Sequence, residues 1–464
     1  MFEFLFDKTY ENGMMNDKEI ILKEIEDFKR SRTLMDMITG EEYYTGNHDI
    51  LKRKREVIGV NGDLVEVTNL PNNQIVDNQY KKMVDQKTNY LLGKPLTIQT
   101  ESEVYAKILK KIFNRKFQRT LKAIGEDSLN CGLAWLYVYY DELGNLSFKR
   151  MKSHELIPGW ADADHTQLDY AIRLYKVKAY EGTMEKEIEK VEVYDSNGIF
   201  YFELDGSKLI SCDPYHVPYF SMGDLSYNWS KIPLIAFKFN AKEIPLIKNV
   251  KSLQDGLNLI ESNFQNSMEE DTRNTILVLT NYDGENLGEF RRNLAQYGAV
   301  KVRSDGDLRT LQVEVNSENY KAILEIFKKA IIENAMGFDA KDDRLAGNPN
   351  QMNIQSMYSD IDLDASNMET EYQASFEELL YFINSHLHNT SKGDFFDEEV
   401  NIIFNRDMLI SETEIIENCQ RSVGILSDET ILAMHPWVDD VHSEIERIKN
   451  QRDLDFEKAF GDGQ

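Results

Sequence analysis

The sequence predicts an α+β protein in which two long helices carry a small β element. Up to about residue 245 the chain mixes strand and helix patterns, with turn signals such as Asn61-Gly62 and Asp205-Gly206 between apolar runs. From Ile247 onward apolar residues recur every three or four positions, as on one face of a helix. The apolar period then changes to two after Thr272 and returns to three or four at Tyr320.

The first long helix is amphipathic and spans roughly 35 Å, at 1.5 Å for each of about 24 residues. Its apolar positions are Ile247, Val250, Leu253, Leu257, Ile260, Phe264 and Met268. Polar residues such as Lys251, Asn258 and Glu261 fall on its other faces. This pattern is typical of a helix with one apolar face and a polar remainder.

The segment that follows predicts a small β element. TILVLTNY, from Thr275, is typical of a buried strand, and AVKVR (299–303) with LRTLQVEV (308–315) predicts a hairpin. The second long helix then begins near Tyr320 and ends at Gly337, which is well placed as a left-handed cap.

The C-terminal part predicts a loop and further helices. AKDDRLAGNPNQ (340–351) is rich in helix breakers and predicts a loop. Apolar residues from Ile354 to Leu387 keep a helical spacing for over thirty residues. The tail is helical and acidic, with helix starts at Ser411 and Ser427. Residues 355–464 hold 25 acidic and 7 basic residues.

The amino-acid composition argues against several classes of protein. A chain of 464 residues, 41% hydrophobic, is large enough for about three folded modules. Its formal charge of -27 argues against a general nucleic-acid binder that holds on by charge. The three cysteines, Cys131, Cys212 and Cys419, lie too far apart for a disulfide framework or a zinc site. MFEFLF is too short for a signal peptide and no apolar run reaches about 18 residues, so we expect a soluble protein.

Catalytic motifs are incomplete. Pro95 stands where a phosphate-binding loop needs Ser or Thr, and Pro158 stands where a zinc-protease helix needs its second histidine. Four acidic residues match a calcium-loop spacing, but Ala365 replaces the required glycine and the stretch has a helical period; the four are Asp360, Asp362, Asp364 and Glu371. We therefore expect no catalytic residue, metal or cofactor.

One basic run stands out in this acidic chain. Residues 107–122 hold no acid and seven bases, namely Lys107, Lys110, Lys111, Arg115, Lys116, Arg119 and Lys122. Apolar residues are interleaved with them, which predicts a basic amphipathic helix. Either this is a solvated face whose long side chains cover a core, or it is a seat for nucleic acid or for acidic surface on a neighbouring copy.

Four segments of the sequence carry a resemblance to a known family. They are NNQIVDNQYKKMVDQKTNYLLGKPLTI (72–98), YYTGNHDILKRKR from Tyr43, GLAWLYVYYDELGNLSF from Gly132, and SLQDGLNLIESNFQNSMEEDTRNTILVLTNYDG from Ser252. Together these segments resemble the portal proteins of long-tailed double-stranded DNA phages. Their order and spacing agree with the family across about residues 35 to 390.

The resemblance implies a portal fold whose subunits form a ring of about twelve copies. The implied regions are a wing (1–246), a stem helix (247–272), a clip (273–316), a second stem helix (317–337), a tunnel loop (338–351), a long helix with the C-terminal part of the wing (352–410) and a helical crown (411–464). It also implies a DNA-facing set in the tunnel loop, Lys341, Arg344, Asn348, Asn350 and Gln351. A set for partner docking in the clip is Asn281, Tyr282, Asp283, Arg303 and Asp305.

The implied role is not enzymatic. Double-stranded DNA would pass through the ring during packaging and ejection, at one capsid vertex of a virion assembled in the host cytoplasm. The implied partners are the terminase large subunit, a head-completion adaptor, and the major capsid and scaffolding proteins, with no membrane. Two alternatives stay open. One is a metal-dependent DNA-processing enzyme with convergent carboxylates such as Asp360 and Asp364, and the other is a helical scaffold or adaptor protein.

Overall fold

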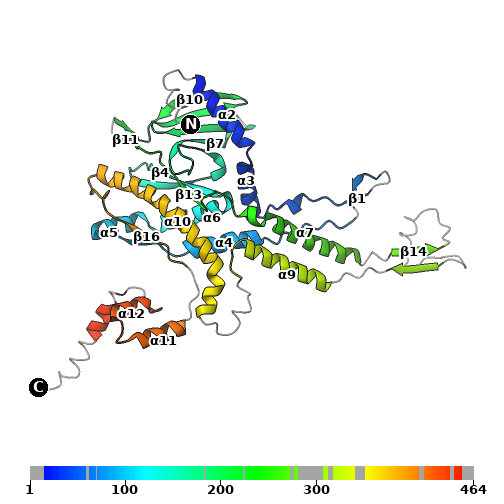
Figure 1. The fold of residues 1–464 in the computed structure, drawn as a ribbon. Coiled ribbons are helices and arrows are strands. Elements are labelled where there is room, and N and C mark those ends of the chain that lie inside the picture. Colours follow the sequence, from blue (N-terminus) through cyan, green and yellow to red (C-terminus); the bar gives the residue numbers. More distant parts are fainter. Residues whose placement is uncertain are drawn as a thin grey trace.

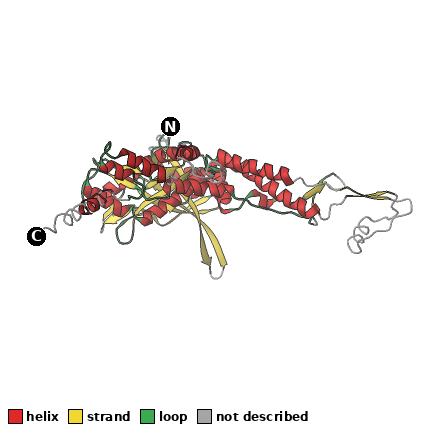
Figure 2. Cartoon of the chain, turned by 90° about the horizontal axis from the view of Figure 1, so that it is seen from below, coloured by secondary structure: helices red, strands yellow, loops and turns green. Residues whose placement is uncertain are grey.

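Two long helices, α7 (Ile247–Asp271) and α9 (Ser317–Asn334), project side by side from a body of helices and sheets in the computed structural model (Figure 1). Beyond them lies a strand pair, β14 (Ile276–Thr280) and β15 (Asp307–Leu311). The described residues are 15–58, 62–68, 70–181, 184–222, 225–271, 276–280, 307–311, 317–339, 351–406, 412–438, 441 and 444–451. The molecule is elongated along the two helices, as Figure 2 also shows.

A five-stranded antiparallel sheet forms one side of the body, in the order β10-β9-β8-β7-β6. Its strands are β6 (Leu156–Trp160), β7 (Leu168–Glu181), β8 (Met184–Asp195), β9 (Gly198–Asp205) and β10 (Lys208–Val217). Gly206 has a φ of 59° and makes the turn between β9 and β10 that the sequence predicts. Helix α2 (Met15–Lys29) buries Ile21 and Ile25 against Ile172 and Phe202 of the sheet.

Strands β7 and β8 extend beyond the rest of this sheet. The pairing of β7 with β6 ends at Arg173, and the pairing of β8 with β9 begins at Glu189. The remainder is a two-stranded ribbon that projects from the body in Figure 2. Two cross-strand ion pairs lie along it, Lys176–Glu187 and Lys178–Glu185. Charged side chains at such exposed strand edges oppose pairing with other chains.

The main core lies between a three-stranded sheet, ordered β13-β4-β5, and four helices. The elements are β4 (Leu133–Tyr140), β5 (Leu146–Met151), β13 (Leu234–Lys238), α3 (Arg32–Thr45), α4 (Gln79–Leu92), α6 (Arg115–Cys131) and α10 (Gln351–Asn389). Alternate residues of β4 enter two different cores. Leu136 and Val138 pack in the main core, whereas Leu133 and Trp135 pack with residues of the five-stranded sheet. Both faces of β4 are therefore covered, which explains its unbroken apolar sequence.

Shorter elements complete the fold. They are η1 (Asp49–Lys52), β1 (Glu56–Ile58), β2 (Leu64–Glu66), β3 (Thr97–Gln99), α5 (Glu103–Ile112), η2 (Ser153–Glu155), β11 (Phe220–Met222), β12 (Leu225–Tyr227), β16 (Asn401–Ile403), α11 (Glu412–Ser422) and α12 (Asp428–Met434). Strand β16 returns after α10 to pair with β3, so the chain after the long helix rejoins the N-terminal part of the body.

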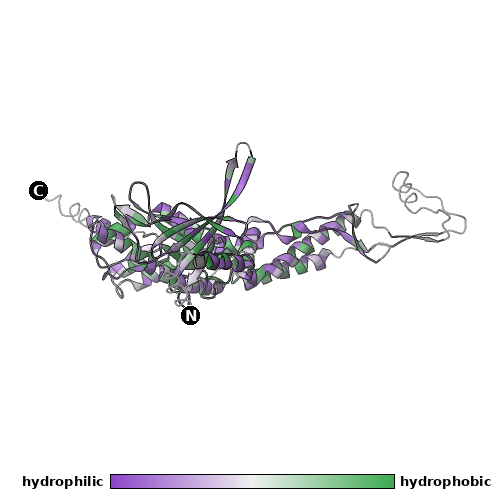
Figure 3. Cartoon of the chain, turned by 90° about the horizontal axis from the view of Figure 1, so that it is seen from above, coloured by the Kyte–Doolittle hydropathy of each residue, from purple (hydrophilic) through white to green (hydrophobic). Residues whose placement is uncertain are grey.

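The predicted long helices are confirmed in α7, α9 and α10, whose hydrophobic and hydrophilic residues are distributed around each helix in Figure 3. The predicted strand from Thr275 is confirmed in β14, which pairs with β15. The segment AVKVR lies outside the described residues. Ser427 caps α12 by accepting a hydrogen bond from the Thr430 amide, as predicted.

The prediction that Gly337 ends the second long helix as a left-handed cap is wrong. Met336, at φ 50°, takes the left-handed conformation, not Gly337. A Cβ on Gly337 would lie 2.6 Å from Met83 Sδ, so glycine is needed there for the close approach of α4. The loop was predicted to extend to Gln351, but Gln351 is already the first residue of α10.

Candidate functional site

The two projecting helices pack closely along their length. A Cβ on Gly256 of α7 would lie 2.5 Å from the Phe327 ring of α9, so glycine lets the helices approach there. Phe264 and Tyr320 contact each other nearer the far end, with ring centroids 4.7 Å apart. The pair therefore forms one two-helix arm, and its attachment to the body decides how rigidly the arm is held.

The attachment is built from four buried polar side chains on α7, spaced four residues apart. They are Gln254, Asn258, Ser262 and Asn266, each at most 1% exposed, and we call them the polar ladder. Spacing of four places them in one row along the helix. Buried amides and hydroxyls without partners would destabilise the fold, so a row of this kind requires matching groups opposite it.

The matching groups are backbone amides of residues 73–80, the segment that leads into the first turn of α4. The Asn73 amide donates to Asn266 Oδ1 at 2.8 Å. The Ile75 amide donates to Ser262 Oγ at 2.9 Å, and the Asp77 amide donates to Asn258 Oδ1 at 3.1 Å. The Tyr80 amide, in the first turn of α4, donates to Gln254 Oε1 at 3.0 Å. The segment therefore runs antiparallel to α7 and is bonded to it at every step.

This pairing works because two repeats nearly coincide. Two residues of extended chain advance about 6.6 Å, and four residues of α-helix advance about 6.0 Å. Between Asn73 and Asp77, every second amide of the segment thus meets every fourth residue of α7. The mismatch of about 0.6 Å per step accumulates to about 1.2 Å over these two steps, which side-chain rotation can absorb. The last bond comes from the Tyr80 amide, three residues after Asp77, in the first turn of α4.

His48 joins a second part of the chain to the ladder. Asn258 Nδ2 lies 2.8 Å from His48 Nδ1, and His48 Nε2 lies 3.1 Å from the Tyr43 carbonyl oxygen. Burial lowers the pKa of His48, which favours the neutral ring. Because Asn258 Oδ1 already accepts from the Asp77 amide, its Nδ2 must donate to Nδ1, and the ring proton lies on Nε2.

Charged residues surround the exposed side of this joint. Lys251 bonds to Asp49 at 2.6 Å and to Asp255 at 2.7 Å, and Asp255 also accepts from the Tyr43 hydroxyl. Burial disfavours the charged ammonium, but these bonds outweigh it and raise the pKa of Lys251. The hydrogen bond from Lys251 is the largest cause that lowers the pKa of Asp49 to about 2. Both groups are therefore charged near neutral pH.

A buried ion pair ties α10 to the same part of the body. Lys87 of α4, 4% exposed in its side chain, bonds to Asp364 of α10 at 2.6 Å and to the Met336 carbonyl oxygen at 3.1 Å. Burial lowers the pKa of Lys87, while the Asp364 charge opposes that shift. One lysine thus connects α4, the end of α9 and the N-terminal half of α10.

Two of the four acidic residues that resemble a calcium loop, Asp362 and Asp364, are engaged in ion pairs. Asp362 accepts from the Tyr90 hydroxyl at 2.8 Å and pairs with Arg406, which also bonds to Glu369 at 2.7 Å. Together with Asp364 they lie along α10 and do not converge on one point. No group of three or more potential metal ligands occurs within the described ranges.

Of the residues that the resemblance assigns to DNA and to partners, only Gln351 lies within the described part of the chain. The clip set (Asn281, Tyr282, Asp283, Arg303 and Asp305) and four of the tunnel-loop set (Lys341, Arg344, Asn348 and Asn350) lie outside the described residues. The fifth, Gln351, begins α10.

The chain just before the 340–350 segment is held by both α4 and α10. Gln86 of α4 both donates to the Phe338 carbonyl oxygen at 2.7 Å and accepts from the Phe338 amide at 2.8 Å. The Phe338 ring also stacks on Tyr358 of α10, with centroids 4.3 Å apart. Phe338 is therefore fixed against both helices.

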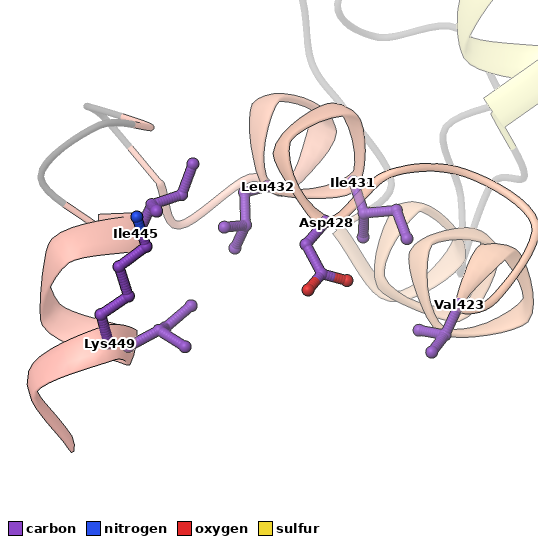
Figure 4. Close-up of a pocket in the computed structure, with 7 residues that line it drawn as sticks. Val423, Asp428, Ile431, Leu432, Ile445 and Lys449 are labelled. Carbon is purple, nitrogen blue, oxygen red and sulfur yellow. The ribbon is translucent and has the colours of Figure 1, made fainter. Parts of the chain in front are cut away.

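The chain also has a shallow apolar pocket, between α12 and residues 444–451 (Figure 4). It is lined by Val423, Ile431, Leu432, Ile445 and Ile448, with Asp428 and Lys449 also present. Apart from that one acid and one lysine, the lining is aliphatic. Such a surface suits packing against another apolar element better than catalysis.

The sequence analysis placed Asn258 on a face other than the apolar one and did not recognise the ladder. The structure shows that Asn258 is fully buried and central to the joint. The signal available was the spacing of Gln254, Asn258, Ser262 and Asn266 in a helix that also has an apolar face.

In the described part of the chain no helix is both long enough and apolar enough to cross a membrane.

Comparison with known proteins identifies the family. The model of the family described as phage portal protein, SPP1 Gp6-like, matches residues 23–455, which is nearly the whole chain. The chain therefore belongs to this phage portal protein family. It is 28% identical over 422 residues to the portal protein of Bacillus phage SPP1, covering 89% of this chain and 83% of the relative.

A second portal relative and two solved structures are also similar. The portal protein of Clostridium phage phiCD119 is 27% identical over 444 residues, covering 92% of this chain and 95% of the relative. One is the neck of an empty gene transfer agent particle, computed with C6 symmetry, which matches with a TM-score of 0.40 at 12% identity. The match covers 76% of this chain and 87% of the chain in that structure. The neck of the native particle, computed with C12 symmetry, has a TM-score of 0.36 at 13% identity, with coverages of 76% and 88%.

Replacement of the central ladder residue is predicted to loosen the joint selectively. Asn258→Ala leaves the Asp77 amide and His48 Nδ1 without their partners, at a cost of about 1–3 kcal/mol for each buried unsatisfied group. Hydrogen exchange followed by mass spectrometry should show faster exchange across residues 73–80. Asn249→Ala, at an exposed position of the same helix, is the matched control. Unchanged protection of residues 73–80 in Asn258→Ala would contradict the role of the ladder.

The buried ion pair is predicted to behave differently in single and double variants. Lys87→Met leaves Asp364 unpaired and should destabilise the fold by about 3 kcal/mol or more. The double variant Lys87→Met with Asp364→Leu should recover most of that loss, because no buried charge remains. Urea unfolding at one fixed chain concentration measures both. Lys81→Met, at a half-exposed surface pair on the same helix, should change stability little. Equal losses in the single and double variants would show that the charge pairing is unimportant.

Proposed function

We propose that this chain is the subunit of a portal ring of about twelve copies at one vertex of a phage capsid. Double-stranded DNA passes through the ring during packaging and ejection. The terminase large subunit and a head-completion adaptor dock at the clip, and the major capsid and scaffolding proteins surround the wing. The match of the portal family model over residues 23–455 carries this proposal. Within the ring the chain is structural and not catalytic.

The shape of the subunit supports this role. A β element held away from the body by a two-helix arm is well suited to project from a ring. Apolar side chains on the outer faces of the arm are exposed, namely Leu259, Met268, Ile323 and Ile326, with Ile326 at 63%. In an isolated subunit these apolar side chains are exposed to water, which is unfavourable. In a ring, neighbouring arms would cover them. We assign the regions 247–272 and 317–337 to the stem and 273–316 to the clip.

The charge of the chain also fits a conduit. Each basic contact to phosphate adds affinity by counterion release, so a basic channel would hold DNA too tightly to let it move. Twelve copies of this chain would instead carry a total formal charge of roughly -320. A mostly repulsive lining with a few cations keeps DNA centred and mobile. We assign these cations to Lys341 and Arg344, in the tunnel loop with Asn348, Asn350 and Gln351. Partner docking is assigned to Asn281, Tyr282, Asp283, Arg303 and Asp305 of the clip.

The contacts of α10 do not favour the alternative of a metal-dependent DNA-processing enzyme. Asp360 and Asp364 lie one helical turn apart, and Asp364 is bonded to Lys87. Neither carboxylate stands at the end of a strand in a cleft. A helical scaffold or adaptor protein, the other alternative, differs from a portal by having no central hole.

Sedimentation and negative-stain imaging of the purified chain test the ring. We expect a particle of about 650 kDa, which is twelve copies of 53.9 kDa, with a hole in its centre. Ile326→Glu should prevent assembly while leaving the monomer folded, and the neighbouring exposed substitution Glu325→Gln should not. Only single molecules at every concentration, or particles with a filled centre, would refute the proposal.

Neutralisation of the tunnel loop is predicted to alter packaging and to spare assembly. Phage particles that carry Lys341→Gln with Arg344→Gln should contain a changed amount of nuclease-protected DNA, because the cations that centre the duplex are lost. Lys321→Gln with Lys329→Gln makes the same charge change at exposed positions of α9 and serves as the control. Loss of the ring in the loop variant would show instead that these residues hold the subunits together.

A further inference from the structure

The basic run of the sequence forms a corner where α5 meets α6. Its five exposed cations are Lys110, Lys111, Arg115, Lys116 and Arg119, and we call them the basic corner. The first two lie in the last turn of α5, and the others follow within the first two turns of α6. Only two residues separate the helices, so all five lie within ten consecutive positions. In Figure 1 α5 lies at the end of the body opposite the two-helix arm.

The cations of the basic corner have no partner in the described part of the chain. None of the five side chains forms an ion pair or hydrogen bond with a described residue. Some exposed lysines elsewhere are paired, as in Lys29–Glu189 at 3.0 Å and Lys54–Glu66 at 2.8 Å, whereas others, such as Lys82 and Lys208, form no ion pair with a described residue. In a chain with 80 acidic residues and 53 basic ones, acidic partners are abundant. Five adjacent unpaired cations are therefore unexpected.

The helix that carries three of these cations is not stabilised by them. The N-terminal end of an α-helix is the positive end of its dipole, where acidic residues are favourable and basic residues are not. The first turn of α6 contains Arg115 and Lys116 and no acidic residue. This arrangement weakens the helix slightly and adds its positive end to the potential of the corner. A bound anion would remove that repulsion.

The chemistry of the surface favours nucleic acid over protein as the anion. The centre of a protein interface is usually apolar or aromatic and poor in lysine. No large apolar side chain between Tyr105 and Glu142 is exposed. Lysine and arginine side chains around a helix N-terminus are groups that contact phosphates.

The net charge of the chain does not prevent such binding. Exposed charges farther apart than about 10 Å are largely screened at 0.1 M salt. The acidic run at residues 394–399 packs against the first turn of α5 through Phe395, which stacks on Tyr105 with centroids 4.4 Å apart. The corner lies at the other end of that helix. Locally, therefore, the potential of the corner is positive.

We propose that the basic corner binds the phosphate backbone of duplex DNA on the outside of the assembled protein. This is a second DNA contact, separate from the channel and from residues 340–350. It explains why one acid-free basic surface is retained in a chain that is otherwise strongly acidic. Because the ligand is a phosphate backbone, the binding should depend on salt and not on sequence.

A covalently closed duplex circle tests this contact, because a closed circle cannot be threaded through a preassembled ring. Binding is measured by fluorescence anisotropy as a function of salt. If all five cations contact phosphates, the logarithm of affinity should fall with a slope of about -4.5 against the logarithm of salt, or about 500-fold between 50 and 200 mM. Neutralising all five to Gln should remove most of that slope.

The matched control neutralises five half-exposed or exposed lysines that are paired. These are Lys29, Lys54, Lys81, Lys176 and Lys178, which give the same change in net charge. Retained binding in this control and loss in the corner variant would support the proposal. Equal losses in both would show that only net charge matters. Loss of assembly in the corner variant alone would show that the corner faces acidic surface of a neighbouring copy. Either of the last two results, or no binding by the unchanged chain, overturns the proposal, and none of them bears on the channel.

Discussion

The structure depends on a match between two backbone repeats. Between Asn73 and Asp77 the chain advances by two residues over nearly the same distance that α7 advances by four, so a row of polar side chains can bond every second amide. A purely apolar joint of the same size would tolerate a sliding helix. Directional hydrogen bonds in a buried setting do not, because a shift of one residue would leave several amides without partners. The register of α7 against the body is therefore fixed.

Fixing that register has consequences at both ends of the arm. α9 follows α7 through close contacts such as Gly256 against Phe327. The end of α9 is in turn held by Gln86 and Lys87 of α4, the helix into which residues 73–80 lead. Lys87 reaches α10 as well. The arm, the body and the long helix are thus joined through one short stretch of chain, and a load on the β14–β15 pair would be transmitted directly to α4 and α10.

The sequence predicted the elements better than it predicted the joint. Periodicity identified α7, α9 and α10 because each has an apolar face that packs on the body or on its neighbour. The joint was missed because its residues are polar, and a polar residue on a helix such as Asn258 is ordinarily exposed. Nothing in residues 73–80 alone shows that their amides will bond to a helix some 190 residues later. The resemblance to portal proteins did single out the segments at Tyr43 and 72–98, which the structure brings together on α7.

The charges of this chain act locally, and this resolves an apparent conflict between its acidity and a function at DNA. Most described cations sit within ion-pairing distance of acids, as Lys251 does between Asp49 and Asp255. Such pairs hold the fold and leave little positive potential outside it. Unpaired cations are different, because no acidic residue of the protein cancels their field, and only solvent ions or a ligand do so. Since screening limits that field to about 10 Å at 0.1 M salt, a surface can repel DNA over most of its area and still retain it at one place. Net charge therefore describes how freely DNA moves past such a protein, whereas the positions of its unpaired cations determine where DNA is held.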